Sequence, residues 1–284
     1  MTIDAHHHFW RYDPVEYGWI PDEASMLRRD FLPRHLEREI EAAGVSGVVS
    51  VQARQTLGET RALLAMARRH DFILGVVGWV PLVDPGVAGI LERFAEEPRL
   101  KACRHVLQEE PDDDYMLGTA FNRGIRAVTA AGLVYDILIF ERHLPQTIRF
   151  VDRHPEQDFV LDHIGKPRIR DGSFSDWNRR IRDLARRPRI RCKMSGLATE
   201  AAWGGWTEEQ FLPYLDTVLE AFGPDRLMFG SDWPVSLPAV GYGRWVEVVR
   251  RYVSTLAPGE RRRILSGTAI ETYGLDPAGP RTGA

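Results

Sequence analysis

Eight short apolar segments recur along the chain, and each is followed by a stretch that can form a helix. Within each segment the apolar residues run almost continuously, which is typical of parallel strands covered on both faces. The segments are residues 3–9, 45–53, 73–80, 100–107, 132–139, 158–165, 190–197 and 227–234. Eight such units without a break in composition predict one α/β domain, a single distorted (β/α)8 TIM barrel.

Local signals predict where several of the intervening helices begin and end. The residues from Thr207 to Gln210 have the pattern of a capping box. A doubly wound open sheet is the alternative fold, but the glycine-rich phosphate loop usual after its first strand is missing. Helices are expected over 34–44, 59–70 and 121–132, and helix ends are expected at Gly44, Gly132 and Gly223.

The barrel is expected to span residues 1–275, and the tail over 276–284 is expected to be disordered. A formal net charge of −3 gives no indication of nucleic-acid binding. No segment has the ~20 apolar residues that a membrane-spanning helix needs. Cys103 and Cys192 lie far apart in apolar runs, so no disulfide framework is expected. These features predict a cytoplasmic protein without nucleic-acid or membrane partners, and they leave the oligomeric state open.

Three consecutive histidines end the first predicted strand. A purification tag is a poor explanation, since apolar residues of a strand flank them on both sides. Successive side chains of a strand point to opposite faces, so His6 and His8 can converge on the barrel axis with Asp4. His7 is then expected to face the helices, together with Ile3. Two imidazoles spaced in this way can bind one metal ion, although histidines in this position also serve as core hydrogen-bonding groups.

Other polar residues stand late in the later strands, where barrel enzymes keep their sites. His163 follows the sixth strand, and Asp232 follows the eighth, where a carboxylate can act as a general base. The structural alternatives are a buried hydrogen-bonding histidine and a turn-forming aspartate before Pro234. Two insertions, 10–32 and 197–206, are expected at the same end of the barrel.

The segments IDAHHHFW, VLDHIGKP, CKMSGL and FGSDWPV, in this order and spacing, resemble the lactonase-like branch of the amidohydrolase superfamily. The resemblance extends over about residues 3–275. It implies a distorted (β/α)8 barrel that hydrolyses a sugar lactone, such as an aldonolactone like L-fuconolactone. The residues that match the family's metal ligands are His6, His8, His163 and Asp232. The implied cofactor is one divalent metal, zinc in the first place, and the sequence leaves open whether it is weakly bound or dispensable.

Lactone hydrolysis needs an activated water, a polarised carbonyl and a proton for the ring oxygen. Asp232 is the predicted general base, assisted by His163 and His105 as further catalytic residues. Aromatic faces and polar tips in the mouth are suited to a sugar. The predicted substrate-binding residues are Arg104, Trp10, Tyr135, Arg142 and Trp233.

Two other function classes remain open at this level. A metal-dependent decarboxylase or hydratase of the same superfamily would act on a small carboxylic acid and would need several arginines around the substrate. Arg104 is the one clear arginine at a strand end, which favours an uncharged lactone. A non-catalytic binding protein is disfavoured, because it has no need of a carboxylate beside the histidines.

Overall fold

A computed structural model describes residues 1–278 and shows eight parallel strands in sequential order. The expected (β/α)8 barrel is confirmed, with every strand inside its predicted segment. The ring closes between the ends of β8 and β1, where His8 N donates to Trp233 O at 2.7 Å and Asp232 N to His6 O at 2.8 Å. The strands are β1 (Ile3–His7), β2 (Gly47–Val51), β3 (Ile73–Gly78), β4 (Leu100–Val106), β5 (Val134–Leu138), β6 (Phe159–Leu161), β7 (Ile190–Met194) and β8 (Leu227–Phe229).

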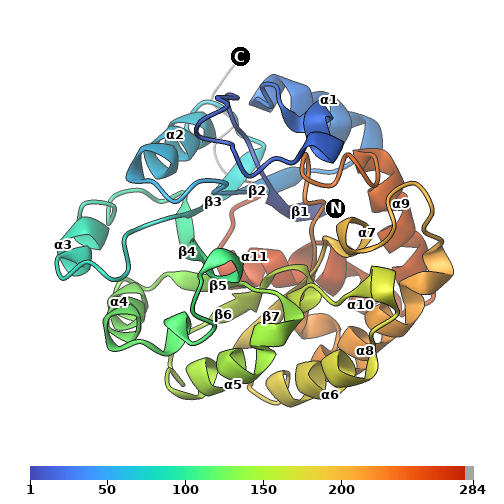
Figure 1. Cartoon of the computed structure of the whole chain (residues 1–284). Helices are drawn as coiled ribbons and strands as arrows, with labels where there is room; N and C mark the ends of the chain where they lie inside the picture. Colours follow the sequence, from blue (N-terminus) through green and yellow to red (C-terminus); the bar gives the residue numbers. More distant parts are fainter. Residues whose placement is uncertain (279–284) are drawn as a thin grey trace.

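Helices surround this ring of strands (Figure 1). Gly44, Gly132 and Gly223 stand at positive φ just after helices, as expected of residues that end them. The capping box over Thr207–Gln210 forms a short 3₁₀ turn ahead of the next helix. The helices are α1 (Pro33–Ala43), α2 (Leu57–Ala67), α3 (Val87–Glu92), α4 (Thr119–Ala130), α5 (Leu144–Asp152), α6 (Ser175–Leu184), α7 (Leu197–Glu200), α8 (Leu212–Phe222), α9 (Tyr242–Val253), α10 (Pro258–Arg262) and α11 (Thr268–Tyr273).

The core has two layers because each strand buries both of its faces. Outward-facing residues such as Val76 and Tyr135 belong to the large hydrophobic cluster that includes the helices. Inward-facing residues such as Val77 and Val160 form a smaller cluster inside the barrel, to which α11 contributes Tyr273. Helix α11 therefore packs against the interior of the barrel, while the opposite end carries the polar residues described below.

A bulge in β1 decides which histidines face inward. Asp4 pairs with Val48 but His7 pairs with Ser50, so β1 contains one residue more than β2 over this stretch. Asp4 Oδ1 accepts hydrogen bonds from His6 N at 3.1 Å and from Ser231 N at 2.8 Å, which stabilises the bulge. The prediction that side chains alternate between the two faces along the whole of β1 was therefore wrong for the residues before the bulge.

Before the bulge, Ile3 and Ala5 point into the barrel interior rather than toward the helices. After it, His6 and His8 point inward, and His7 contacts Ser50 Oγ through Nε2 at 2.9 Å. The predicted separation of the three histidines is thus observed, but for a different reason.

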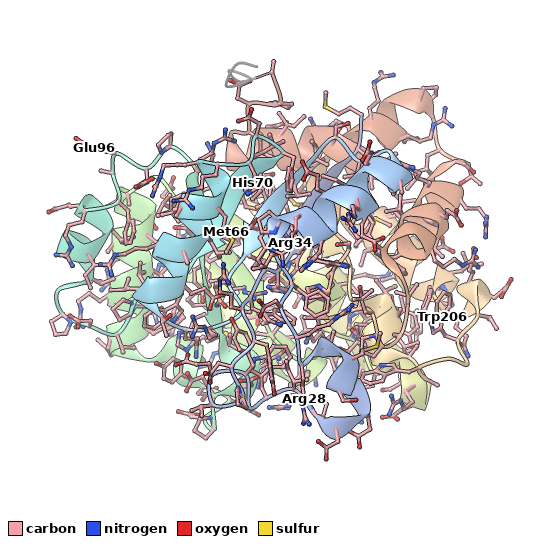
Figure 2. The ribbon with its side chains drawn as sticks, turned by 90° about the horizontal axis from the view of Figure 1, so that it is seen from above. Arg28, Arg34, Met66, His70, Glu96 and Trp206 are labelled. Atoms are coloured by element: carbon pink, nitrogen blue, oxygen red, sulfur yellow. The ribbon has the colours of Figure 1, made fainter. Side chains whose placement is uncertain are left out.

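The insertion over 10–32 covers the carboxyl ends of the strands. Figure 2 shows Arg28 of this insertion at the opposite end of the barrel from His70 and Glu96, which precede β3 and β4. Within the described residues, no helix is long and apolar enough to cross a bilayer. Most of the predicted tail, from residue 279 onward, lies outside the described part of the chain.

Candidate active site

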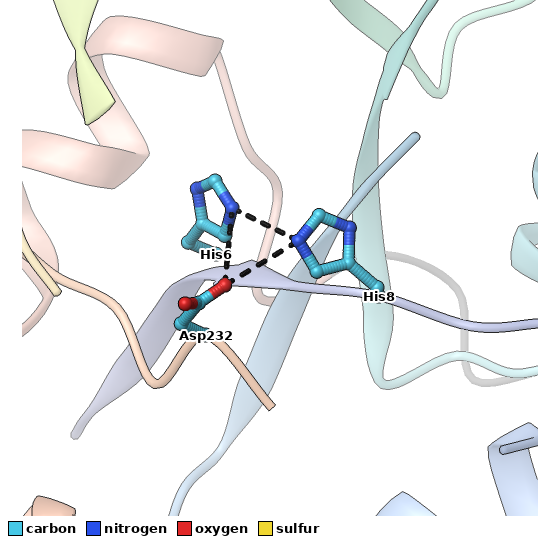
Figure 3. Close-up of side chains that lie close together, drawn as sticks. All are labelled: His6, His8 and Asp232. Carbon is cyan, nitrogen blue, oxygen red and sulfur yellow. Dashed lines mark hydrogen bonds and ion pairs between the residues drawn. The ribbon is translucent and has the colours of Figure 1, made fainter. Parts of the chain in front are cut away.

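His6, His8 and Asp232 meet at the carboxyl ends of β1 and β8 (Figure 3). The Nε2 atoms of His6 and His8 are 3.2 Å apart. Asp232 Oδ1 lies 3.7 Å from His6 Nε2 and 3.4 Å from His8 Nε2. All three side chains are buried, so the sequence-predicted cluster forms a compact polar site rather than a solvated surface.

His163 joins the cluster from the turn after β6. Its Nε2 lies 3.9 Å from Asp232 Oδ1, and its ring centroid lies 4.4 Å from that of His6. The backbone has unusual φ angles in the two turns that supply His163 and Asp232. The non-glycine residues with positive φ in residues 1–278 are His163, Ile164, Lys166 and Asp232. Such conformations cost about 1–3 kcal/mol each and concentrate at functional sites, so the strain coincides with the placement of two site residues.

Two glycines make room for the imidazoles. A Cβ on Gly196, which has φ +72°, would lie 2.7 Å from His163 Nδ1. A Cβ on Gly230 would lie 2.8 Å from His6 Cβ. Real Cβ atoms do not approach so closely, and neither neighbour is the end of a flexible chain. The glycines of the CKMSGL and FGSDWP segments are therefore required by the packing of the site.

The spacing of the nitrogen and oxygen atoms fits one divalent ion. Tetrahedral zinc ligands at about 2.0–2.1 Å from the metal lie about 3.3–3.4 Å from one another, close to the separations of His6, His8 and Asp232. His8 Nδ1 lies 2.9 Å from the Val51 carbonyl, to which it donates, and His163 Nδ1 lies 2.9 Å from Ser195 Oγ. These contacts hold both rings with Nε2 toward the cluster, as expected of metal-binding histidines.

A network of buried charges lies directly beneath His6. Lys193 Nζ contacts Asp136 Oδ2 at 2.5 Å, Asp162 Oδ1 at 3.0 Å and His6 Nδ1 at 3.2 Å. Arg104 Nη1 donates to Asp162 Oδ2 at 2.9 Å and lies 3.4 Å from His6 Nε2. The site therefore rests on two cations and two carboxylates that compensate one another, as buried charges must.

Burial and neighbouring charges set the protonation states. Burial lowers the pKa of His163 to about 4 and holds that of His6 well below its usual value. Burial opposes ionisation of Asp232, but the His163 and His8 imidazoles and the Lys166 ammonium lower the pKa of its carboxyl below the usual value. Near neutral pH, the cluster thus offers neutral His6 and His163 imidazoles and a carboxylate, which is the form that binds metal and accepts a proton.

A pocket of about 490 Å³ opens above the cluster and is lined by His8, His163 and Asp232 at its base. Its walls include Trp19 from the 10–32 insertion, Arg54 and Gln108. Gln108 Oε1 is buried at this wall and has no hydrogen-bond partner within residues 1–278. A polyhydroxylated molecule can supply such a partner, and the volume suits a small ligand.

Two pairs of adjacent polar residues are separated by strand alternation. Arg104 and Asp136 pair across β4 and β5 and face the interior, and Arg104 lines the pocket. His105 and Tyr135 point the other way. His105 contacts Glu110 at 2.6 Å and stacks on Tyr115, whereas Tyr135 packs in the outer core. The structure therefore places the predicted catalytic His105 and the predicted substrate-binding Tyr135 outside the pocket.

Three other predicted substrate contacts also lie away from the pocket lining. Trp10 packs edge-on against Phe31 and donates its Nε1–H to Arg29 O at 2.9 Å. Trp233 also packs edge-on with Phe31, at a ring-centroid distance of 5.2 Å, and is 2% exposed. Arg142 pairs with Asp113 at 3.2 Å at the surface. Hydrophobic packing thus explains the two tryptophans, and Trp19 is the tryptophan that reaches the pocket.

Sequence reasoning gave no firm role to Ser195, Lys193 or Asp162. Asp162 Oδ1 lies 3.3 Å from His6 Nδ1, and Ser195 Oγ contacts His163 Nδ1 at 2.9 Å. A sequence signal for Lys193 and Ser195 was available, because they lie two residues apart in an apolar segment. Strand alternation places side chains with this spacing on the same face. Their partners come from other strands and could not be named from spacing alone.

Comparison with known proteins gives one family match and several full-length relatives. The amidohydrolase family model matches residues 3–275. The chain is 41% identical to an L-fucono-1,5-lactonase of Burkholderia multivorans, with 99% of both proteins covered. It is 36% identical to an L-fucono-1,5-lactonase of Burkholderia ambifaria, covering 97% of this chain and 96% of the relative. A crystal structure of a B. multivorans amidohydrolase with bound zinc superposes with a TM-score of 0.93, at 40% identity, over 97% of this chain and 100% of that one.

Proposed function

Because the chain belongs to the amidohydrolase family, we propose that its site hydrolyses a sugar lactone, an aldonolactone of the L-fucono-1,5-lactone type, to the sugar acid. The observation that carries the proposal is the convergence of three imidazoles and the Asp232 carboxylate at the base of a pocket. The relatives named as L-fucono-1,5-lactonases support the substrate class.

We propose zinc as the metal, held by His6, His8, His163 and Asp232. The spacing of His6, His8 and Asp232 fits it, His163 Nε2 lies 3.9 Å from Asp232 Oδ1, and a similar protein has been crystallised with zinc. When bound, zinc supplies Lewis acidity toward the lactone carbonyl and lowers the pKa of an adjacent water. Carbohydrate metabolism is the proposed role, because the relatives are named as sugar lactonases. The cytoplasm is the proposed location, because Cys103 and Cys192 are free thiols.

The protein's own groups account for the proton transfers. Asp232, ionised because of its lowered pKa, accepts a proton from the attacking water as oxygen bonds to the lactone carbonyl carbon. Arg104, which reaches the pocket from β4, is positioned to donate a hydrogen bond to the carbonyl oxygen as negative charge develops there. Cleavage of the bond between that carbon and the ring oxygen then returns the proton from Asp232 to the ring oxygen, which becomes a hydroxyl.

The charges around the pocket favour a neutral substrate. Each cation of the lining has an acidic partner within the described residues: Arg54 pairs with Glu16 and Glu59, Arg104 with Asp162, and Lys166 with Glu200 at 4.0 Å. A carboxylate substrate would need an unpaired guanidinium or ammonium to replace its hydration. The metal-dependent decarboxylase or hydratase alternative is therefore less well supported than the lactonase.

A substrate panel distinguishes these functions. We expect the zinc-loaded protein to open five- and six-membered aldonolactones in a pH-indicator assay, and to act poorly on lactones that carry carboxylates. Carbon dioxide release from aromatic acids is measured in parallel. Release of carbon dioxide without lactone hydrolysis would favour the decarboxylase and contradict the proposal.

A further inference from the structure

His6 has contacts that suit two different positions of its ring proton. A neutral imidazole carries one N–H and offers one lone pair, so its two nitrogens cannot play the same role. Asp162 Oδ1 and Lys193 Nζ both lie at Nδ1, at 3.3 and 3.2 Å. The first is an acceptor and the second is a donor, so they stabilise opposite tautomers.

One tautomer completes a continuous chain of hydrogen bonds. His8 must carry its proton on Nδ1, because Nδ1 lies 2.9 Å from the Val51 carbonyl, which only accepts. A hydrogen bond across the 3.2 Å between the Nε2 atoms of His8 and His6 then places the proton on His6 Nε2, and in this form the 3.4 Å contact of Arg104 Nη1 with the same nitrogen is not a hydrogen bond. With its proton there, His6 Nδ1 accepts from Lys193, whose ammonium also donates to Asp136 and forms an ion pair with Asp162.

The other tautomer is the one that binds metal. Coordination through Nε2 needs a lone pair there, so the proton of His6 must move to Nδ1. Asp162 Oδ1 is placed to accept it at 3.3 Å, since within the described residues this buried oxygen forms an ion pair with Lys193 Nζ at 3.0 Å but makes no hydrogen bond. Lys193 loses one acceptor in this state but keeps Asp136 and Asp162.

We propose that Lys193 and Asp162 are positioning residues that set the ring tautomer of His6, and thereby the affinity of the site for zinc. Lys193 stabilises the Nε2–H form, which cannot coordinate, and Asp162 stabilises the Nδ1–H form, which can. The inference rests on the proposed zinc site but not on the lactone, and its test uses no substrate.

The first test uses the unmodified full-length protein. Histidine labelled with ¹⁵N reports which ring nitrogen carries the proton, and the signals of His6 are assigned by their loss in a His6→Gln variant. We expect the His6 proton on Nε2 in chelator-treated protein and on Nδ1 after one equivalent of zinc. A proton that stays on the same nitrogen in both samples, or zinc that does not bind at His6, would overturn the proposal.

The second test compares zinc dissociation constants of variants. Lys193→Met is combined with Asp136→Asn, so that no buried carboxylate is left without a partner. This double variant should move the His6 proton toward Nδ1 without zinc and bind zinc about tenfold more tightly. Asp162→Asn should weaken zinc binding about 10- to 100-fold, the usual effect of losing a partner of a ligating histidine.

Asp136→Asn alone is the matched control, because Asp136 contacts Lys193 but is not among the contacts of His6. It removes the same carboxylate and leaves the Lys193 contact with His6 in place. If the double variant has the same His6 tautomer and zinc affinity as this control, Lys193 does not set either property and the proposal is contradicted. The wild-type spectra decide the matter should the double variant fail to fold.

Discussion

A Cβ atom on Gly196 would lie 2.7 Å from Nδ1 of His163. The residue after Ser195 must therefore lack a side chain, because Ser195 and His163 approach each other to form the 2.9 Å contact that orients the imidazole. One glycine in a loop after β7 thus determines the position of a histidine supplied by the turn after β6.

Gly196→Ala tests this relationship. The added methyl group should displace the His163 ring, and misplacement of a catalytic group by about 1 Å can reduce kcat/KM by about 10²-fold. The matched control is Gly132→Ala, at similar positive φ but with no atom of the described chain within 4 Å of the added Cβ. Both variants should lose stability from backbone strain, about 1–3 kcal/mol, while only Gly196→Ala should lose activity. Equal activities of the two variants would show that the ring does not depend on Gly196.

Asp232→Asn should fold and lose activity. Asparagine tolerates the positive φ of 58° at this position, and it has nearly the same volume as aspartate. Because an amide cannot accept the water proton, kcat should fall by about 10²–10⁴-fold. Asp113→Asn, which removes a carboxylate paired with Arg142 outside the pocket, should retain wild-type turnover. Thermal unfolding of both variants checks that the barrel is intact.

The activity should be insensitive to pH across the range in which ordinary histidines titrate. The pKa of His163 is about 4 and that of Asp232 is below its usual value, so both keep their active forms well below pH 6. We expect kcat/KM to stay level from pH 8 to about pH 5 and to fall at lower pH, as these groups bind protons. A decline in kcat/KM centred near pH 6.5 would mean that the His163 imidazole is not buried as described.

The lowered pKa of His163 also predicts how the stability of the folded protein changes with pH. The unfolded chain protonates His163 near its usual pKa of 6.5, whereas the folded protein does so at about 4. Its contribution therefore destabilises the folded state as pH falls through this interval and is absent above it. Denaturant unfolding of wild type and of His163→Gln measures the contribution as the difference between their pH dependences. Parallel curves between pH 6.5 and 4 would contradict it.

Gln108→Met should weaken recognition of hydroxyl groups. Its buried Oε1, which has no hydrogen-bond partner in residues 1–278, lies in the pocket wall, and losing one neutral hydrogen bond costs roughly threefold to tenfold in binding. We expect kcat/KM to fall by that factor for an aldonolactone and to change little for δ-valerolactone, which has no hydroxyl groups. The same loss for both substrates would show that Gln108 acts through pocket shape.

Strand periodicity predicted the barrel, because buried parallel strands have a continuous apolar pattern that survives local irregularity. It also brought His6, His8, His163 and Asp232 to one end, since all follow or end strands. The β1 bulge was missed because it depends on the Asp4 side chain and on Ser231, which is distant in sequence. Only the folded structure shows that Ile3 and His6 share the barrel interior.

The substrate-binding residues were harder to predict. The alternation that separates His7 from His6 also separates Arg104 from His105 and Asp136 from Tyr135. Sequence alone therefore shows that only one member of each adjacent pair can face the pocket. No pattern distinguishes Trp19, which lines the pocket, from Trp10, which fills the core of the same insertion. That difference arises from tertiary packing.

The proposed function of the site of three histidines and Asp232 is to open a neutral sugar lactone. Its most direct test is kcat/KM for L-fucono-1,5-lactone hydrolysis, measured for wild type and Asp232→Asn with zinc and after chelation, and corrected for spontaneous opening. We predict hydrolysis far above the spontaneous rate for wild type and its loss in the variant. No acceleration of this or any other aldonolactone under either condition, or equal rates for the two proteins, would contradict the claim.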